Sequence, residues 1–313
     1  MNKQGELYKV WQVLKQSGSA FIDGKVLKLS AALAYYTIFS VAPMLIIIIF
    51  FCDLFLGKDA IEGNIYGQIR GLVGSEAALQ IQSMIKNASL SGDMNWATIA
   101  GFITLIIGAT GVFAEVQDSI NFIWGLKSKP QKNGLLRMLL NRLLSFSLVV
   151  SMGFILLVSL AVNGLMELFS HIITSMLPSK ITSGILFSLA DFVVPFLVIT
   201  TLFAIIFKVL PDARISWKDV RVGAITTAIL FMAGKFAIGY YLGTSKVSST
   251  YGAAGSIVII LLWVYYSAAI LYFGAVFTRV YLQYSGAKIY PNDYAVWVKQ
   301  VEIPHEPEII EEG

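Results

Sequence analysis

One stretch near the end of the chain decides the fold: Ser249–Val280, which reads STYGAAGSIVIILLWVYYSAAILYFGAVFTRV. Small, bend-permitting residues lead into a run that carries no charge before Arg279. The run exceeds the ~20 apolar residues that a helix needs to cross a bilayer. We therefore expect a membrane-spanning helix here, with the other apolar segments packed around it.

The composition of the whole chain points to the same class. Of its 313 residues, 57% are hydrophobic and only 13% are charged, and the mean hydropathy is +0.73. Soluble domains carry about 25% charged residues. The sequence therefore predicts an all-α, polytopic membrane protein. The first apolar run is too long for the apolar core of a signal peptide, so we expect it to stay as a membrane anchor.

Six apolar segments are long enough to be transmembrane helices. They cover residues 31–56, 96–124, 139–169, 185–209, 222–242 and 255–281. They form a membrane domain over 30–282, between an amphipathic segment over 1–29 and a tail over 283–313 whose acidic end is predicted to be disordered. The N-terminal segment fits either an interfacial helix on the cytoplasmic surface or a short soluble helix packed on the protein.

Lys and Arg residues predict the orientation. Most of the 23 lie in the N-terminal segment, in the loops after the second and fourth spans, and in the tail. The regions expected outside hold Lys58, Arg70, Lys86, Lys180 and Lys246. This asymmetry predicts that both termini are cytoplasmic. The first outer loop, 57–95, has the periodicity of short amphipathic helices, which would either cap a cavity or pack on the outer surface.

Ionisable residues inside a span are expensive and suggest function. Lys235 and Asp191 lie at similar depth on adjacent predicted spans, roughly 10 Å below the outer end. They are candidates for a substrate or ion site; a structural ion pair, or a lysine that snorkels outward, is the alternative. Glu115, Asp118 and Arg142 lie near the inner interface, where they would form a salt-bridge cluster or an inner gate.

Backbone features supply further candidates. Pro43 lies inside the first span and predicts a helix kink. A turn containing Tyr251, Gly252, Gly255 and Ser256 would present backbone N–H groups to an anion such as a lipid phosphate, or would only let two spans pack tightly.

Several classes of function find no support in the residues. The sequence contains no HExxH, GxxxxGK[ST] or GxSxG motif, no spacing of metal ligands, and no basic surface interleaved with aromatic residues. We therefore expect no enzymatic activity, no cofactor, no metal and no nucleic-acid partner. Membrane lipids are the expected partners. The GxxxG spacing of Gly239 and Gly243 would permit either a homo-oligomer or packing within the chain.

Two regions resemble the YihY/BrkB family of bacterial inner-membrane proteins. The first is Leu29–Pro43, LSAALAYYTIFSVAP. The second combines Tyr251–Ser256 with Leu262–Ser267 and Phe273–Ala275. The likeness extends over about residues 20–285 and has matching span order.

The resemblance implies a multi-pass protein of the bacterial plasma membrane. Members of the family are linked to serum resistance and to export of lipid A precursors, and an older ribonuclease BN label is regarded as a misassignment. Val276 stands where the family often has a glutamate, so any role of that glutamate does not carry over to this chain.

The leading hypothesis is a transporter, or an accessory factor, that moves a lipid or other amphiphile during envelope biogenesis. It combines the kinked first span, the amphipathic outer loop and the anion-binding turn with the family link. An ion-coupled solute transporter using Asp191 and Lys235 is one alternative. A membrane scaffold without transport activity is another.

Overall fold

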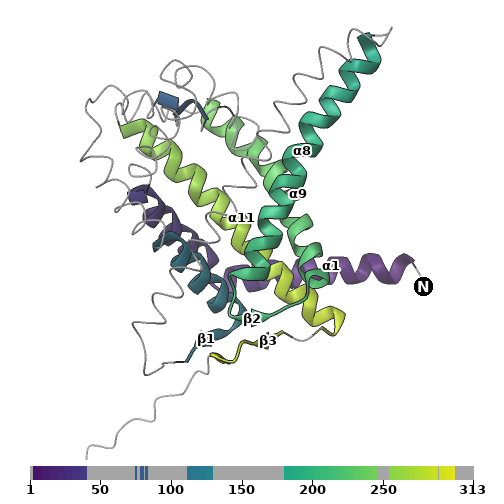
Figure 1. The fold of residues 1–313 in the computed structure, drawn as a ribbon, viewed down its shortest axis with the longest axis vertical. Helices are drawn as coiled ribbons and strands as arrows, with labels where there is room; N and C mark the ends of the chain where they lie inside the picture. The colour runs from purple at the N-terminus through teal and green to yellow at the C-terminus, as the bar shows by residue number, and fades with distance from the viewer. Residues whose placement is uncertain are drawn as a thin grey trace, which may run out of the picture.

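The computed structural model describes residues 3–40, 111–129, 180–244, 254–287 and 289–299, together with residues 75, 78–80, 82 and 83 (Figure 1). Three helices in these ranges are long and apolar enough to cross a membrane: Phe192–Val209, Trp217–Thr244 and Ile257–Ser285. They coincide with the last three predicted spans. The predicted span over 139–169 and the predicted kink at Pro43 lie outside the described residues.

Helices make up most of the described residues. The first is α1, Lys3–Asp23, followed by an apolar helix over Val26–Ser40 and a helix over 111–124. The later helices are α8, Lys180–Val209; α9, Trp217–Thr244; and α11, Gly255–Ser285. The strands are β1, Leu126–Ser128; β2, Ala213–Arg214; β3, Tyr290–Pro291; and β4, Ala295–Trp297.

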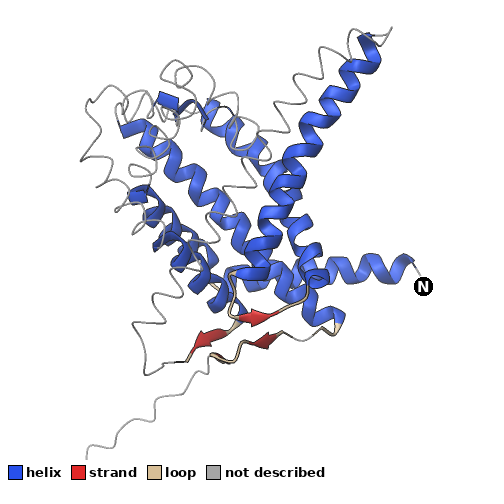
Figure 2. Cartoon of the chain, in the orientation of Figure 1, coloured by secondary structure: helices blue, strands red, loops and turns tan. Residues whose placement is uncertain are grey.

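The strands are a departure from the all-α prediction. β1 pairs with β4 and β2 pairs with β3, both antiparallel, in two two-stranded sheets. Strands of two or three residues are too short to show a two-residue hydrophobic period, so the sequence gives no signal for them. Their pairing gathers the loop after helix 111–124, the loop after α8 and the tail at one end of the helices, here called the loop end (Figure 2).

The first part of the tail is described just after α11. α11 continues to Ser285 and ends at Gly286, whose φ of 73° provides the left-handed conformation that commonly terminates a helix. Residues 289–299 then include β3 and β4, while the acidic end that is predicted to be disordered stays a prediction. Backbone pairing with the two loops explains why this part of the tail is structured, and residues 300–313 lie outside the description.

A reciprocal arrangement of glycine and threonine holds α9 against α11. Thr278 packs over Gly223, and Thr227 packs over Gly274. A Cβ built on Gly223 would lie 2.9 Å from the Thr278 Cβ, and one on Gly274 would lie 2.8 Å from the Thr227 Cγ2. Each threonine hydroxyl donates a 2.7 Å hydrogen bond to the carbonyl of the glycine one turn earlier on its own helix. Small residues thus allow close approach without leaving a buried hydroxyl unpaired.

The GxxxG spacing in α9 does not serve this packing. Gly239 has open space where a Cβ would stand. Gly234, one turn earlier, is instead covered by the ring and hydroxyl of Tyr266 from α11. The close contact between α9 and α11 therefore uses a glycine and a threonine four residues apart in each helix. These are Gly223 and Thr227 in α9, and Gly274 and Thr278 in α11.

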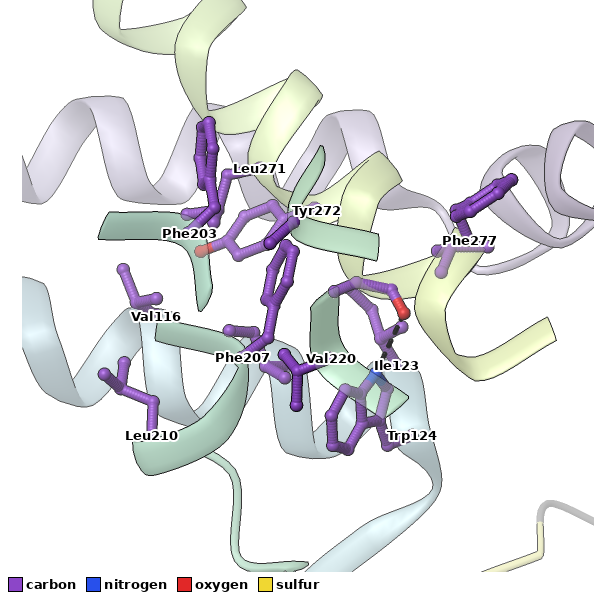
Figure 3. Packing of buried hydrophobic residues seen from close by; sticks show 14 of the residues in the cluster. Val116, Ile123, Trp124, Phe203, Phe207, Leu210, Val220, Leu271, Tyr272 and Phe277 are labelled. Atoms are coloured by element: carbon purple, nitrogen blue, oxygen red, sulfur yellow. Dashed lines mark hydrogen bonds between the residues drawn. The ribbon is translucent and has the colours of Figure 1, made fainter. Parts of the chain in front are cut away.

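Large aromatic side chains fill the space where helix 111–124, α8, α9 and α11 meet (Figure 3). Trp124, Phe207 and Tyr272 are fully buried there. α1 packs on α11 through Val13, Ser17 and a Phe21–Phe273 edge-to-face contact with ring centroids 5.7 Å apart. Its opposite face exposes large apolar side chains, namely Tyr8, Trp11 and Ile22. α1 thus combines features of the two interpretations offered for the N-terminal segment.

Candidate functional site

A cleft of about 880 Å³ opens at the loop end between α1, helix 111–124, β1 and α11. Its polar and charged lining comprises Gln16, Asp23, Asp118, Asn121, Lys127, Ser128, Arg279, Gln283 and Lys299. Its apolar lining includes Val26, Phe122, Ile123, Val276, Val280 and Val298. Charged groups and apolar side chains therefore share one cavity, which is the chemistry that an amphiphilic ligand requires.

Arg279 occupies a fixed position in the wall of this cleft. It is the only charged residue of α11. Its guanidinium donates a hydrogen bond to the carbonyl of Ile123, at the C-terminal end of helix 111–124. Carbonyls in the last turn of a helix have no partner within the helix, so Arg279 satisfies one of them. A guanidinium has five N–H donors, and this bond uses one of them.

Trp124 makes a second hydrogen bond between helix 111–124 and α11. Its indole Nε1–H donates a 2.9 Å hydrogen bond to the carbonyl of Ala275 on α11, drawn as a dashed line in Figure 3. The side chain is fully buried, so the bond lies away from water. Trp124 and Arg279 together fix the end of helix 111–124 against α11, and this contact shapes one side of the cleft.

We expect Trp124→Phe to lower the free energy of unfolding by about 2 kcal/mol, because it loses a buried hydrogen bond and leaves a void. Thermal unfolding in detergent, followed by near-ultraviolet circular dichroism, measures the change. Trp217→Phe is the matched control, since Trp217 is exposed on the first turn of α9. Equal effects of the two substitutions would contradict the role assigned to the Trp124 bond.

Gly125 makes the tight turn at the floor of the cleft. Its φ is +70°, and a Cβ there would lie 3.2 Å from the carbonyl oxygen of Val298. Both the left-handed backbone and the close approach of the β4 end favour glycine at this position. The turn directs the chain from helix 111–124 into β1, which pairs with β4.

Asp212 organises the loop end beside the cleft. It is 2% exposed, and its carboxylate accepts hydrogen bonds from Gln117 Nε2 at 3.0 Å, Asn121 Nδ2 at 3.0 Å and Ser128 Oγ at 2.6 Å. Its backbone N–H donates to Asn121 Oδ1, and its carbonyl accepts from the Asn292 N–H. A single residue between α8 and β2 thus connects helix 111–124 and β1 through its side chain, and the tail through its backbone carbonyl.

The structure separates the members of the predicted inner cluster, which are Glu115, Asp118 and Arg142. Asp118 lines the cleft, whereas Glu115, one turn earlier, accepts a 3.2 Å hydrogen bond from Ser119 and does not line it. Arg142 lies outside the described residues. Arg279 lines the cleft with Asp118, as do Lys127 and Lys299, and no ion pair joins Arg279 to Asp118 among the described residues.

The pairing of Lys235 with Asp191 stays a prediction. Lys235 is half-buried on α9, with its Nζ 5.3 Å from the centroid of the Phe236 ring. Asp191 belongs to α8, but its side chain lies outside the description. Figure 1 shows α8 and α9 crossing and then diverging away from the loop end. A contact between the two side chains is therefore untested.

The predicted anion-binding turn is described only where α11 begins. Gly255 is buried at the first position of the helix, and Ala254 before it gives no side-chain capping hydrogen bond. Tyr251, Gly252 and the side chain of Ser256 lie outside the described residues. The turn stays a prediction.

Sequence reasoning missed Arg279 and Asp212. Arg279 had a signal, because it is the lone charge in an otherwise apolar span, and such charges mark functional or structural contacts. Asp212 had almost none. It stands in a Pro-Asp turn at the end of a span, where an aspartate is usually solvated.

Comparison with known proteins agrees with a multi-pass membrane protein. The family described as Virulence factor BrkB matches residues 18–294. A UPF0761 membrane protein of Stenotrophomonas maltophilia (strain R551-3) is 27% identical over 247 residues, covering 78% of this chain and 55% of the relative. One from Saccharophagus degradans is 25% identical over 259 residues, covering 83% and 57%. No solved structure matches the chain.

The fold defines an integral membrane protein that crosses the bilayer several times and carries a mixed polar and apolar cleft at one end. The chain belongs to the Virulence factor BrkB family. Its predicted location, the bacterial inner membrane, is confirmed by these relatives and by the three spans. The chain spans about half the length of the curated relatives it matches.

Proposed function

We propose that this protein moves a lipid or other amphiphile across the inner membrane, or assists a protein that does so. The observation that carries the proposal is the cleft at the loop end, which is lined by the charged side chains of Arg279 and Asp118 together with Val276 and Val280. A small polar solute would leave the apolar wall unused, and a purely apolar ligand would bury the charges without compensation.

The position of the cleft also supports this function. Its α11 wall lies in the last third of a helix that is long and apolar enough to cross the membrane. A headgroup bound there would stay close to the membrane surface, while its chains could remain among apolar side chains such as Phe122, which is half exposed. Movement of the headgroup, not of the chains, is the costly step in lipid translocation, because polar groups lose their water.

Translocation by the purified protein tests the proposal. The protein is reconstituted into vesicles containing fluorescent phospholipids, and dithionite added outside reports how fast inner-leaflet lipid becomes accessible. We expect faster exchange than in empty vesicles. Rates equal to those of empty vesicles for anionic and zwitterionic lipids alike would overturn the proposal and favour a scaffold.

A cleft-filling variant links transport to this site. Gln283 lies exposed on α11 and lines the cleft, so Gln283→Trp should fill it and reduce translocation to the rate of empty vesicles. Ser285→Trp is the matched control, because Ser285 is exposed on the same turn but does not line the cleft. Unchanged transport by Gln283→Trp would contradict the assignment of this cleft as the route.

A further inference from the structure

The cleft presents charges of both signs from different elements. Arg279 contributes a guanidinium from α11, with Lys127 and Lys299 at the rim. Asp118 contributes a carboxylate from helix 111–124, and Asp23 a second one from α1. We propose that the cleft binds the headgroup of a zwitterionic aminophospholipid, whose phosphate meets Arg279 and whose ammonium meets Asp118. This inference rests on the proposed function, since it names the class of amphiphile.

The first argument is that the two charges are held apart. Arg279 is fixed to the carbonyl of Ile123, and Asp118 lies five residues earlier on that helix, about 7.5 Å along its axis. No ion pair joins them among the described contacts. Opposite charges that line one cavity without neutralising each other are complementary to a ligand that carries both signs.

The second argument concerns the donors that remain on Arg279. One N–H is used on the Ile123 carbonyl, and the planar guanidinium keeps others for a phosphate, which it binds with good geometry. The same bond holds the side chain in place, so a ligand would not have to order it. An anionic lipid without an amine would meet this arginine too, but it would offer no cation to the carboxylates of Asp118 and Asp23.

The third argument concerns the acyl chains. Val276, Val280 and Phe122 form apolar lining next to the charged groups. Val276 is buried, and Asp118 is the carboxylate that helix 111–124 contributes to the lining of the cleft. A free amino-phosphate ester would satisfy the charges but not the apolar lining, so a lipid is the better match.

Binding, measured separately from transport, tests the inference. Native mass spectrometry of the full chain in detergent compares phosphatidylethanolamine with phosphatidylglycerol, which keeps the phosphate but lacks the amine. We expect wild type to prefer phosphatidylethanolamine about fivefold, as one partly exposed ion pair would provide. Asp118→Asn should abolish this preference while keeping binding of phosphatidylglycerol, which a misfolded protein would not do.

Glu115→Gln is the matched control, because it removes a carboxylate from the same helix outside the cleft and should leave the preference intact. Equal binding of the two lipids by wild type, or a preference that survives Asp118→Asn, would overturn the inference. Competition by soluble phosphoethanolamine as effective as that by the lipid would overturn the lipid assignment. Selective binding without translocation in vesicles would leave the inference standing and contradict the proposed function.

Discussion

Gly223→Ala should destabilise the protein by about 3 kcal/mol, at the upper end of what overpacking a well-filled core costs. A Cβ on Gly223 would lie 2.9 Å from the Thr278 Cβ and closer still to its hydroxyl. Thr278 cannot move away easily, because it is fully buried and its hydroxyl is bonded to the Gly274 carbonyl. Thermal unfolding of the purified protein in detergent, or the fraction that stays monodisperse after heating, measures the loss.

Two further variants identify the cause. Gly239→Ala, on the same helix, meets open space and should leave stability unchanged or raise it by up to ~1 kcal/mol through better helix propensity. Thr278→Ala combined with Gly223→Ala should be more stable than Gly223→Ala alone, because the hydroxyl and methyl that collide are gone. If the double variant were the less stable one, the clash would not be the reason for the defect.

The spans were predictable because their signal is strong and local. Long uncharged runs such as Ile257–Ser285 need no tertiary information to be recognised. The partners of each helix were not predictable in the same way. The sequence drew attention to Gly239 and Gly243, since their GxxxG spacing is familiar. The helices instead meet at Gly223 and Gly274, each facing a threonine, and this becomes visible only when two distant segments are placed together.

The candidate site shows the same division. Asp118 could be singled out because an ionisable residue near the end of a span is unusual, and it does line the cleft. Its predicted partner, Arg142, belongs to the next span, whereas Arg279, which lines the same cleft, comes much later in the chain. The depth of a residue along a helix can be counted from the sequence, but which helices pack beside each other cannot be read from it. The cleft therefore combines segments that no spacing rule connects.

Asp212→Ala is expected to lower the free energy of unfolding about as much as Gly223→Ala, because it removes a buried hydrogen-bond acceptor. The carboxylate is 2% exposed and accepts hydrogen bonds from Gln117, Asn121 and Ser128. Removing it leaves those donors without an acceptor, and each buried donor left unpaired costs ~1–3 kcal/mol. Because Ser128 is exposed and can turn to water, we expect a total loss of about 3 kcal/mol.

The loss should be concentrated at the loop end, where the Asp212 carboxylate joins helix 111–124 to β1, the strand that pairs with β4 of the tail. Limited trypsin digestion should cut faster after Lys127 and Lys299 in Asp212→Ala, because Lys127 lies within β1, where it pairs with Val296, and Lys299 follows the end of β4. Asp212→Asn, which keeps the size and one acceptor, should fall between the alanine variant and wild type.

Asp293→Ala is the matched control, since its 2.5 Å ion pair with Arg214 is largely exposed and exposed pairs contribute ~0–1 kcal/mol. Faster tail cleavage in Asp293→Ala than in Asp212→Ala would show that the surface pair, and not the buried carboxylate, holds the tail to the helices.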